Sequence, residues 1–370
     1  MPLIIPFFLM NRGCPHRCIF CNEKLTAGDH PVRISEAVFV ETVRAHLASA
    51  KQRRGPAEIA FYGGTFTGMK RAEQSRLLEM AAPFLREGRV AGIRISTRPD
   101  GIDAECCDFL RGHGVTTVEV GAQSLDDEVL IRSRRGHTAA DTVRALSLLR
   151  ERGFKPGLHL MAGLPGDSPG RFAETISRTI ALRPETVRLH PTLVLRDTPL
   201  ADAFRKGDYV PLGLAEAVDL GKKALRTLTA AGIPVIRLGL QTTRELEEPG
   251  AVLAGPFHPA FRTLVETALF SEMAAALFEA AGWGTGLPGI PAETVAGRLS
   301  VQFALSPADV SNFCGHRREN IAALKRRFQL DGIRIASDPA LPRLTLVLTA
   351  GERRLHTDLS GAIRNLSFSR

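Results

Sequence analysis

Short apolar runs rich in β-branched residues recur along the first 240 residues, and an amphipathic stretch with helical spacing separates each run from the next. The runs predict strands at 3–9, 58–64, 92–97, 116–122, 157–163, 186–194 and 234–240. Repeated strand–helix units predict a parallel sheet, and continuously apolar strands are typical of a sheet buried on both faces. So many units in this length favour an α/β fold of the partial or full (β/α) TIM-type barrel over a doubly wound sheet.

The stretches between the strands carry helix start and stop signals. One helix is expected to begin at Ser35. A second is expected to begin at Thr138, where Asp141 completes a capping box, and to end at Gly153. A third is expected over 214–231. Each of these helices lies between two predicted strands, as a (β/α) unit requires.

The strand–helix rhythm breaks after about Gly250. A long helix is expected over 259–281, and the segment 282–291, GWGTGLPGIP, is rich in glycine and proline. A basic helix that runs into a strand is expected over 310–335, and another strand at 345–349. These elements predict a separate, smaller α+β domain.

A chain of 370 residues is long enough for two domains. We place a barrel domain at 1–245 and the smaller C-terminal α+β domain at 246–370. The second domain contains GHRRENIAALKRRFQ at 315–329, a helix with several arginines and lysines. This helix either contacts phosphates of a substrate such as RNA or is the solvated face of a basic protein.

The net charge of +9 and the isoelectric point of about 9.6 favour polyanionic partners, such as nucleic acid or phosphorylated small molecules. A basic balance is equally common in arginine-rich proteins from GC-rich genomes. No run approaches the about 18 apolar residues of a membrane span. The apolar start lacks a basic region and a cleavage site, so it predicts a buried strand and not a signal peptide. We expect a cytoplasmic protein with reduced thiols, of unspecified oligomeric state.

Three of the six cysteines lie within the stretch RGCPHRCIFCNE, which directly follows the first predicted strand. Their spacing lets Cys14, Cys18 and Cys21 converge on one centre at a small cost in loop closure. A structural zinc ion takes four ligands, and only His16 offers a fourth nearby. The alternative is a four-iron cluster held by three thiolates, with one iron left open. Both kinds of metal site stay open at this point.

The C-x3-C-x2-C spacing after the first strand of a barrel resembles the radical S-adenosylmethionine (SAM) superfamily, and Phe20 matches an aromatic residue common before the third cysteine. The resemblance implies a [4Fe-4S] cluster on Cys14, Cys18 and Cys21 whose open iron chelates SAM. Reductive cleavage of SAM would then give a 5′-deoxyadenosyl radical. It also implies an external electron donor of the flavodoxin or ferredoxin type.

Polar and glycine-rich residues end the other predicted strands, where a barrel places its ligands. By resemblance, the pair after the second strand contacts the SAM amino group, with Thr65 where many members have an acidic residue. Residues after strands three and four and in the segment RSRRGHTAAD would contact the ribose or carboxylate, and MAGLPG would pack on the adenine. The implied cofactor-binding residues are Phe20, Gly63, Gly64, Thr65, Ser96, Thr97, Arg98, Gln123, Ser124, Arg135, Met161, Gly163 and His190.

Several segments within residues 3–245, including YGGTFTG, STRPDGI and RLHPTLVLRDTPLADAFRKGDYVPL, resemble the radical SAM part of the elongator catalytic subunit, which modifies tRNA. The cysteines are more closely spaced here, and residues 250–370 contain no acetyl-coenzyme-A pyrophosphate loop. The resemblance implies modification of tRNA or rRNA. Two alternatives are a small-metabolite oxidoreductase like the oxygen-independent coproporphyrinogen oxidases, and a zinc-stabilised RNA-binding protein without catalysis.

Overall fold

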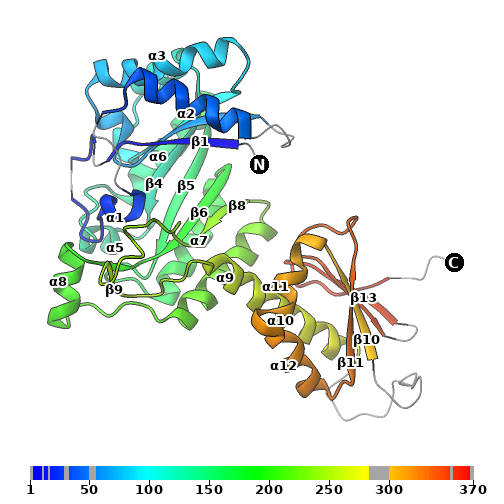
Figure 1. The fold of residues 1–370 in the computed structure, drawn as a ribbon. Coiled ribbons are helices and arrows are strands. Elements are labelled where there is room, and N and C mark those ends of the chain that lie inside the picture. The colour runs from blue at the N-terminus through cyan, green and yellow to red at the C-terminus, as the bar shows by residue number, and fades with distance from the viewer. Residues whose placement is uncertain are drawn as a thin grey trace. The chain divides into compact units, whose positions relative to one another are not determined.

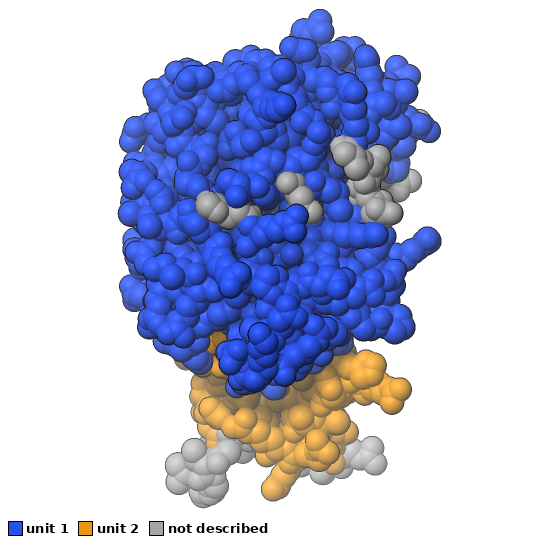
Figure 2. Space-filling view, turned by 90° about the vertical axis from the view of Figure 1, so that its left-hand side faces the viewer, with its two compact units in different colours: residues 1–217, 233–259 blue, residues 218–232, 260–370 orange. Residues whose placement is uncertain are grey.

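The computed structural model describes residues 3–10, 12–15, 17–28, 33–49, 56–282, 300–350 and 353–366. The chain divides into two compact units, blue and orange in Figure 2. The first consists of Met1–Ala217 with Ile233–Pro259, and the second of Val218–Gly232 with Ala260–Arg370. The expected division at residue 245 stays a prediction about folding domains.

The first unit is built on a seven-stranded parallel sheet whose strands follow the chain order (Figure 1). The strands are β1 (Leu3–Phe8), β2 (Ala57–Tyr62), β3 (Gly92–Thr97), β4 (Val115–Gln123), β5 (Lys155–Ala162), β6 (Thr186–Pro191) and β8 (Val235–Leu238). Among these strands β1 pairs only with β2, and β8 only with β6. The sheet is thus an open half-barrel, and the prediction of a partial (β/α) barrel is confirmed.

Helices connect the strands in the predicted alternation. They are α1 (Glu23–Ala27), α2 (Glu36–Ser49), α3 (Arg71–Arg86), α4 (Ala104–Gly112), α5 (Asp127–Arg132), α6 (Ala139–Glu151), α7 (Pro169–Leu182) and α8 (Pro199–Lys206). The predicted capping box is present, because Thr138 and Asp141 each accept a hydrogen bond from the other's backbone N–H. In the described part of the chain, no helix is both long and apolar enough to cross a membrane.

The two faces of the seven-stranded sheet differ in chemistry. The outer face is apolar and packs on helices: the ring of Phe7 stacks on Phe39 of α2 at 4.4 Å, and Phe61 lies 6.2 Å from Phe39. The inner face, which alternates with it along each strand, has buried charged side chains such as Arg94 and Glu119. The strands are buried on both faces as predicted, but only one face is apolar.

The strand predicted at 186–194 is shorter in the structure. Strand β6 ends at Pro191, and the separate strand β7 (Val194–Leu195) pairs antiparallel with β9 (Val252–Ala254). Val194 of this ribbon belongs to a buried apolar cluster with Ile19 of the loop after β1, and Leu195 to one with Leu25 of α1. The ribbon therefore contributes to the site rather than to the barrel.

The second unit is a five-stranded sheet in the order β11-β10-β12-β13-β14, with helices beside it (Figure 1). Its elements are β10 (Ser300–Leu305), β11 (Gly332–Ser337), β12 (Leu346–Ala350), β13 (Arg353–Thr357), β14 (Arg364–Asn365), α10 (Phe261–Ala280), α11 (Val310–Cys314) and α12 (Glu319–Phe328), and α9 (Leu214–Ala230) from Val218 onwards. The predicted α+β character is confirmed, as is the helix expected at 214–231. The basic helix expected from residue 310 is interrupted at Gly315. Of the segment 282–291, all but Gly282 lies outside the described residues.

Candidate functional site

The three clustered cysteines lie on one loop at the C-terminal end of β1. The Cys14 Sγ is 3.4 Å from the Thr65 Oγ1 at the end of β2, and the buried Cys18 Sγ accepts a hydrogen bond from Arg135 Nη1 at 3.0 Å. The Cys21 backbone N–H donates to the Cys18 carbonyl at 3.2 Å, which closes a tight turn between them. Cys14 and Cys21 are exposed. The loop thus presents two thiols at the surface and one beneath.

The cysteine loop packs backbone against backbone on the loop that follows β2. The Thr65 N–H donates to the Arg12 carbonyl at 2.8 Å, and the Gly64 N–H donates to the Glu23 carboxylate at 2.6 Å. A Cβ at Gly64, which has a φ of +58°, would lie 2.2 Å from the Arg12 carbonyl oxygen. A Cβ at Gly13 would lie 2.2 Å from the Thr65 carbonyl oxygen. Glycine is therefore required at both positions by close approach.

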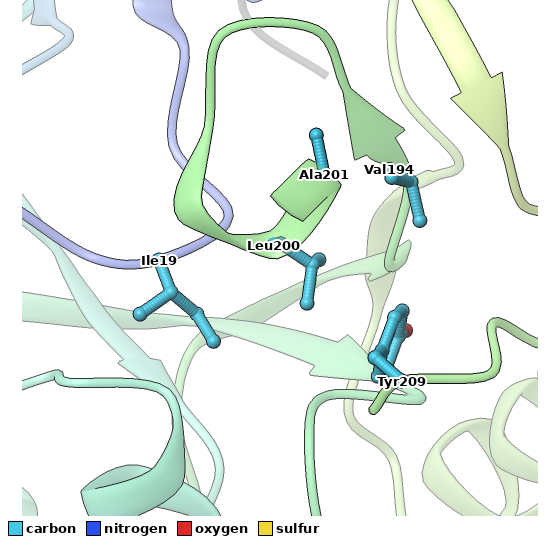
Figure 3. Close-up of a cluster of buried hydrophobic side chains, with 5 residues drawn as sticks. All are labelled: Ile19, Val194, Leu200, Ala201 and Tyr209. Carbon is cyan, nitrogen blue, oxygen red and sulfur yellow. The ribbon is translucent and has the colours of Figure 1, made fainter. Parts of the chain in front are cut away.

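Apolar contacts hold the cysteine loop from its other side. The Ile19 N–H donates to the Ser133 carbonyl at 3.3 Å, and the Ile19 carbonyl accepts from the Leu200 N–H at 2.8 Å. The side chain of Ile19 belongs to a buried cluster whose other members come from β7, α8 and the residues after α8: Val194, Leu200, Ala201 and Tyr209 (Figure 3). The half-buried Phe20 packs against this cluster. The part of the chain after β6 thus positions residues near the start of the chain.

Arg135 links the cysteine loop to β4. Helix α5 ends in a Schellman motif: the Arg134 N–H donates to Ile131 and the Arg135 N–H to Leu130, with Arg134 in the left-handed region at φ +52°. The Arg135 guanidinium reaches Cys18 and also donates to the Gly121 carbonyl at 2.6 Å. Its Nε is buried and has no partner among the described residues.

Arg98 positions the backbone of Arg135. Its Nη1 donates to the Arg135 carbonyl, while its Nε and Nη2 bind the Asp100 carboxylate at 2.9 Å each. Arg98 was assigned to the cofactor by resemblance. In the structure its polar atoms are engaged by protein groups, so its visible contribution is to place Arg135.

Two more of the predicted residues also bond mainly within the protein. The Thr97 Oγ1 lies 2.6 Å from the Thr67 Oγ1, and the Ser124 Oγ accepts from the Asp126 N–H at 3.1 Å. Gln123 differs from both. Its backbone is left-handed at φ +66°, and its buried Oε1 has no partner among the described residues. Such an orphaned acceptor in a strained residue is typical of a ligand-binding position.

The remaining predicted residues lie on the inner face or just above it. Strand register places Met161 beside His190 and Ser96 beside Glu119 on this face. Gly163 follows β5 at φ +77°, and its carbonyl accepts from the Tyr209 hydroxyl at 2.6 Å. The His190 Nδ1 lies 3.1 Å from the His159 Nε2, and the His190 Nε2 is buried with no described partner.

A buried charge network occupies the inner face below these residues. Glu119 accepts hydrogen bonds from Arg94 at 2.7 Å, from Arg188 Nη2 at 3.0 Å and from the Tyr62 hydroxyl at 3.2 Å. Its Oε2 also lies 2.8 Å from the Arg188 Nε as an ion pair. Arg94 also binds Glu58 at 2.7 Å. Burial and the Glu119 charge raise the pKa of Tyr62. Sequence reasoning assigned none of these charged residues a role; their alternate positions within predicted strands were the available signal.

The two histidines of the inner face are held neutral. Burial, reinforced by the Arg188 charge, lowers the pKa of His159 to about 3. Burial and His159 lower the pKa of His190 well below its ordinary value. Close to Arg135, burial and that arginine lower the pKa of His137 to about 4. Sequence reasoning missed His137 and His159.

The thiols of the cysteine loop have the electrostatics of a cation site. Burial raises the pKa of Cys14 and of Cys21, and negative charge on Glu23 and on the neighbouring cysteines raises both further. Cys14 and Cys21 each reach the surface, but protein groups crowd the rest of each thiol, and this crowding favours the protonated form. Three mutually repelling thiolates on one loop fit a positively charged metal group. In the described ranges no three His, Cys, Asp or Glu side chains already converge as a metal site. His16, the candidate fourth zinc ligand, lies outside them.

A parallel half-barrel whose first strand leads into a three-cysteine loop defines a class of SAM-dependent iron–sulfur enzymes. Residues 8–179 match the family described as the Radical SAM superfamily, and residues 184–271 match the Radical_SAM C-terminal domain. The chain belongs to the radical SAM superfamily and is a radical SAM enzyme. Members of this superfamily use a [4Fe-4S] cluster and SAM, and they generally need an electron donor.

The relatives confirm the resemblance to elongator-like proteins. The chain is 28% identical over 246 residues to the tRNA uridine(34) acetyltransferase of Methanocaldococcus infernus, covering 56% of this chain and 46% of that protein. It is 36% identical over 230 residues to the protein of the same name from Dehalococcoides mccartyi, covering 54% and 50%. The chain thus spans about half the length of the curated relatives it matches.

A solved structure shares the fold. The archaeal Methanocaldococcus infernus Elp3 with an N-terminal deletion superposes with a TM-score of 0.54 at 22% identity, over 76% of this chain and 63% of that one. At this identity the likeness concerns the fold alone.

Proposed function

We propose that Cys14, Cys18 and Cys21 hold a [4Fe-4S] cluster that cleaves SAM, and that the enzyme modifies RNA, either tRNA or rRNA. When bound, the cluster supplies the electron that converts SAM into methionine and a 5′-deoxyadenosyl radical. The observation that carries the proposal is the three-cysteine loop itself: Cys14 lies beside Thr65 after β2, and Cys18 accepts a hydrogen bond from Arg135, which also binds β4.

The chain's own residues around the loop suit a zwitterionic cofactor. The Arg135 Nε is an unpartnered buried donor next to Cys18, and the Gln123 Oε1 is an unpartnered buried acceptor. A carboxylate would accept from the Arg135 Nε, and an ammonium group would donate to the Gln123 Oε1. Each of these bonds would remove the cost of an unpaired buried polar group, about 1–3 kcal/mol. Of the remaining predicted residues, Gly63, Gly64, Thr65, Met161 and Gly163 stay candidates for contact with SAM.

Arg135 also places a positive charge against Cys18. The thiolate is the form of cysteine that binds metal, and its charge is complementary to that of a guanidinium. Arg98 fixes the Arg135 backbone, and the Gly121 carbonyl fixes its guanidinium. The arginine is therefore preorganised at the cysteine loop.

RNA as substrate is supported by the relatives named tRNA uridine(34) acetyltransferases and by the net charge of +9. Contacts to phosphates release counterions, so binding should weaken steeply with salt. We assign phosphate contact to the C-terminal region 246–370, with the basic segment 315–329 as its candidate surface. We also propose a cytoplasmic enzyme that takes electrons from a flavodoxin- or ferredoxin-type donor.

The substrate is tested by incubating the reconstituted enzyme with dithionite, SAM and total tRNA or rRNA, followed by mass spectrometry of the nucleosides. We expect a mass change on a nucleoside that is absent without SAM or with the Cys18→Ala variant. RNA binding measured at 50 and 200 mM salt should differ by more than tenfold. Absence of binding at low salt, together with SAM cleavage stimulated by a small metabolite, would establish the oxidoreductase alternative.

The zinc alternative has a separate test by metal analysis. A chain isolated and handled without oxygen should carry iron and sulfide, and a spectrum that dithionite bleaches. One equivalent of zinc and no colour would instead favour a non-catalytic RNA-binding protein.

A further inference from the structure

The charges on the inner face of the sheet do not balance. Three guanidinium groups project from β3, β6 and β8 at Arg94, Arg188 and Arg237, and two carboxylates face them at Glu58 and Glu119. Arg94 binds both carboxylates and Arg188 binds Glu119. This pairing leaves one positive charge.

The unbalanced charge belongs to Arg237. In the described part of the chain it forms no ion pair, and β-sheet register sets it directly beside Arg188 on the neighbouring strand. Adjacent strands lie about 4.8 Å apart, and like charges directly opposite each other destabilise a sheet. Burial and the charge of Arg188 lower the pKa of Arg237 by more than the charge of Glu119 raises it. Half-buried guanidinium groups in this arrangement are expected to take an anion.

A hydrogen-bond donor lies on the same face. Register places His159 beside Arg188, and His190 is two residues further along β6. When the His159 Nε2 donates to the His190 Nδ1, the neutral His190 carries its proton on Nε2, and that buried atom has no described partner. In this tautomer the face offers a cation and a directed N–H.

We propose that Arg237, Arg188 and His190 form an oxyanion-binding site on the inner face of the half-barrel, which receives a carboxylate or phosphate of the molecule that the enzyme modifies. The binding of an anion follows from the unpaired charge of Arg237 beside Arg188 and does not depend on the proposed function. Its assignment to the substrate, and not to SAM, rests on the proposed function. The cofactor carboxylate already has a candidate partner in Arg135, beside the cysteines.

The site is tested on the full chain by calorimetric titration with inorganic phosphate and with acetate, at an ionic strength fixed with sodium chloride. The wild type should bind at least one of them saturably, and Arg237→Gln should weaken that binding at least tenfold. Arg86→Gln, an exposed arginine at the end of α3, is the matched control and should bind like the wild type. Absence of saturable binding, or equal loss in both variants, would overturn the proposal.

Thermal unfolding gives a second readout that does not depend on activity. In chloride buffer Arg237→Gln should unfold at a higher temperature than the wild type, because the repulsion with Arg188 is gone. Phosphate or acetate should raise the melting temperature of the wild type and leave that of Arg237→Gln unchanged. A variant that is less stable and still responds to the anion would contradict the assignment.

Two further experiments identify the molecule that carries the anion. Uridine 5′-monophosphate against succinate distinguishes a phosphate from a carboxylate ligand, and the tighter binder should lose affinity in Arg237→Gln. On the reconstituted enzyme, Arg237→Gln should bind SAM as the wild type does. A matching loss of SAM affinity would assign the site to the cofactor and overturn the substrate assignment. If phosphate binds but the wild type cleaves no SAM, the anion site stands and the proposed function fails.

Discussion

The outer and inner faces of the seven-stranded sheet are both buried but differ in the interactions that hold them. The outer face stacks aromatic and aliphatic side chains such as Phe7 and Phe61 on helix α2. The inner face gathers Arg94, Glu119 and Arg188 around shared hydrogen bonds. Apolar burial stabilises a fold without regard to precise partners, whereas buried charges must be paired to be tolerated.

The contrast separates stability from function. Substitutions on the outer face should change the free energy of unfolding and leave ligand binding alone. Substitutions on the inner face should act through unpaired charge, and removing a cation that has no partner should be neutral or stabilising.

Phe61→Ala should destabilise the protein by about 3–5 kcal/mol, because it opens a cavity at a fully buried ring that contacts three other phenylalanines. The change is measured by denaturant unfolding monitored by circular dichroism. Ile131→Ala, at a side chain that is 75% exposed, is the control and should fall within about 0.5 kcal/mol of the wild type. A loss below about 1 kcal/mol at Phe61 would show that the outer face is not the main apolar core.

Glu119→Gln should cost about 3 kcal/mol, because two arginines lose a shared buried counter-charge. Adding Arg188→Met should recover part of the loss, since the second substitution removes one of the stranded cations. A double-mutant cycle measures the coupling between the two positions. Strictly additive losses would indicate that the two side chains do not interact as the ion pair implies.

The neutral histidines predict a dependence of stability on pH. The pKa of His159 is about 3 in the folded chain, below the about 6.5 of an unfolded histidine. Below about pH 6.5, His159 therefore binds a proton in the unfolded state but not in the folded state. The free energy of unfolding falls as the pH drops below this value. The slope should be about 1.4 kcal/mol per pH unit from this histidine.

His159→Phe should flatten that slope between pH 6.5 and the pKa of about 3. Unfolding free energies of both proteins at several pH values provide the measurement, with His113→Phe, a histidine outside the inner face, as the control. The groups that face His159 are His190, Arg135, Arg188 and Arg237. An unchanged slope would mean that His159 titrates normally in the folded protein.

Arg134→Gly should stabilise the protein by about 1 kcal/mol, because a left-handed arginine at the end of α5 occupies the position that glycine prefers. Arg86→Gly, at the last residue of α3, should change stability in the opposite direction by a similar amount. Thermal melts of both variants test the difference. A loss of stability in Arg134→Gly would show that the side chain makes contacts that outweigh the backbone strain.

Local signals in the sequence were sufficient for much of the fold. Strand β3 matches its prediction residue for residue. The segment GIRIST is rich in β-branched residues and is followed by the turn-forming sequence RPDG. The Thr138–Asp141 capping box was readable because its partners are three residues apart. Sequence reasoning missed β10 and β13, in which polar residues interrupt the apolar ones.

The candidate site was less predictable where its contacts are distant in sequence. Nothing local indicates that Glu23 accepts from Gly64, or that Arg98 holds the Arg135 carbonyl. The charge on the inner face also depends on strand register, which a single sequence does not specify. Resemblance supplied the cysteines and the strand ends, and the structure added the residues that position them.

The most direct test of the account is release of 5′-deoxyadenosine from SAM by the anaerobically reconstituted chain with dithionite. The wild type should be brown and should release the nucleoside over many minutes. Cys14→Ala, Cys18→Ala and Cys21→Ala should each lose the cluster spectrum and the product together, while Cys106→Ala and Cys314→Ala should retain both. Release of 5′-deoxyadenosine by the Cys18→Ala variant at the wild-type level, or none by a fully loaded wild type, would contradict the assignment of the cysteine loop.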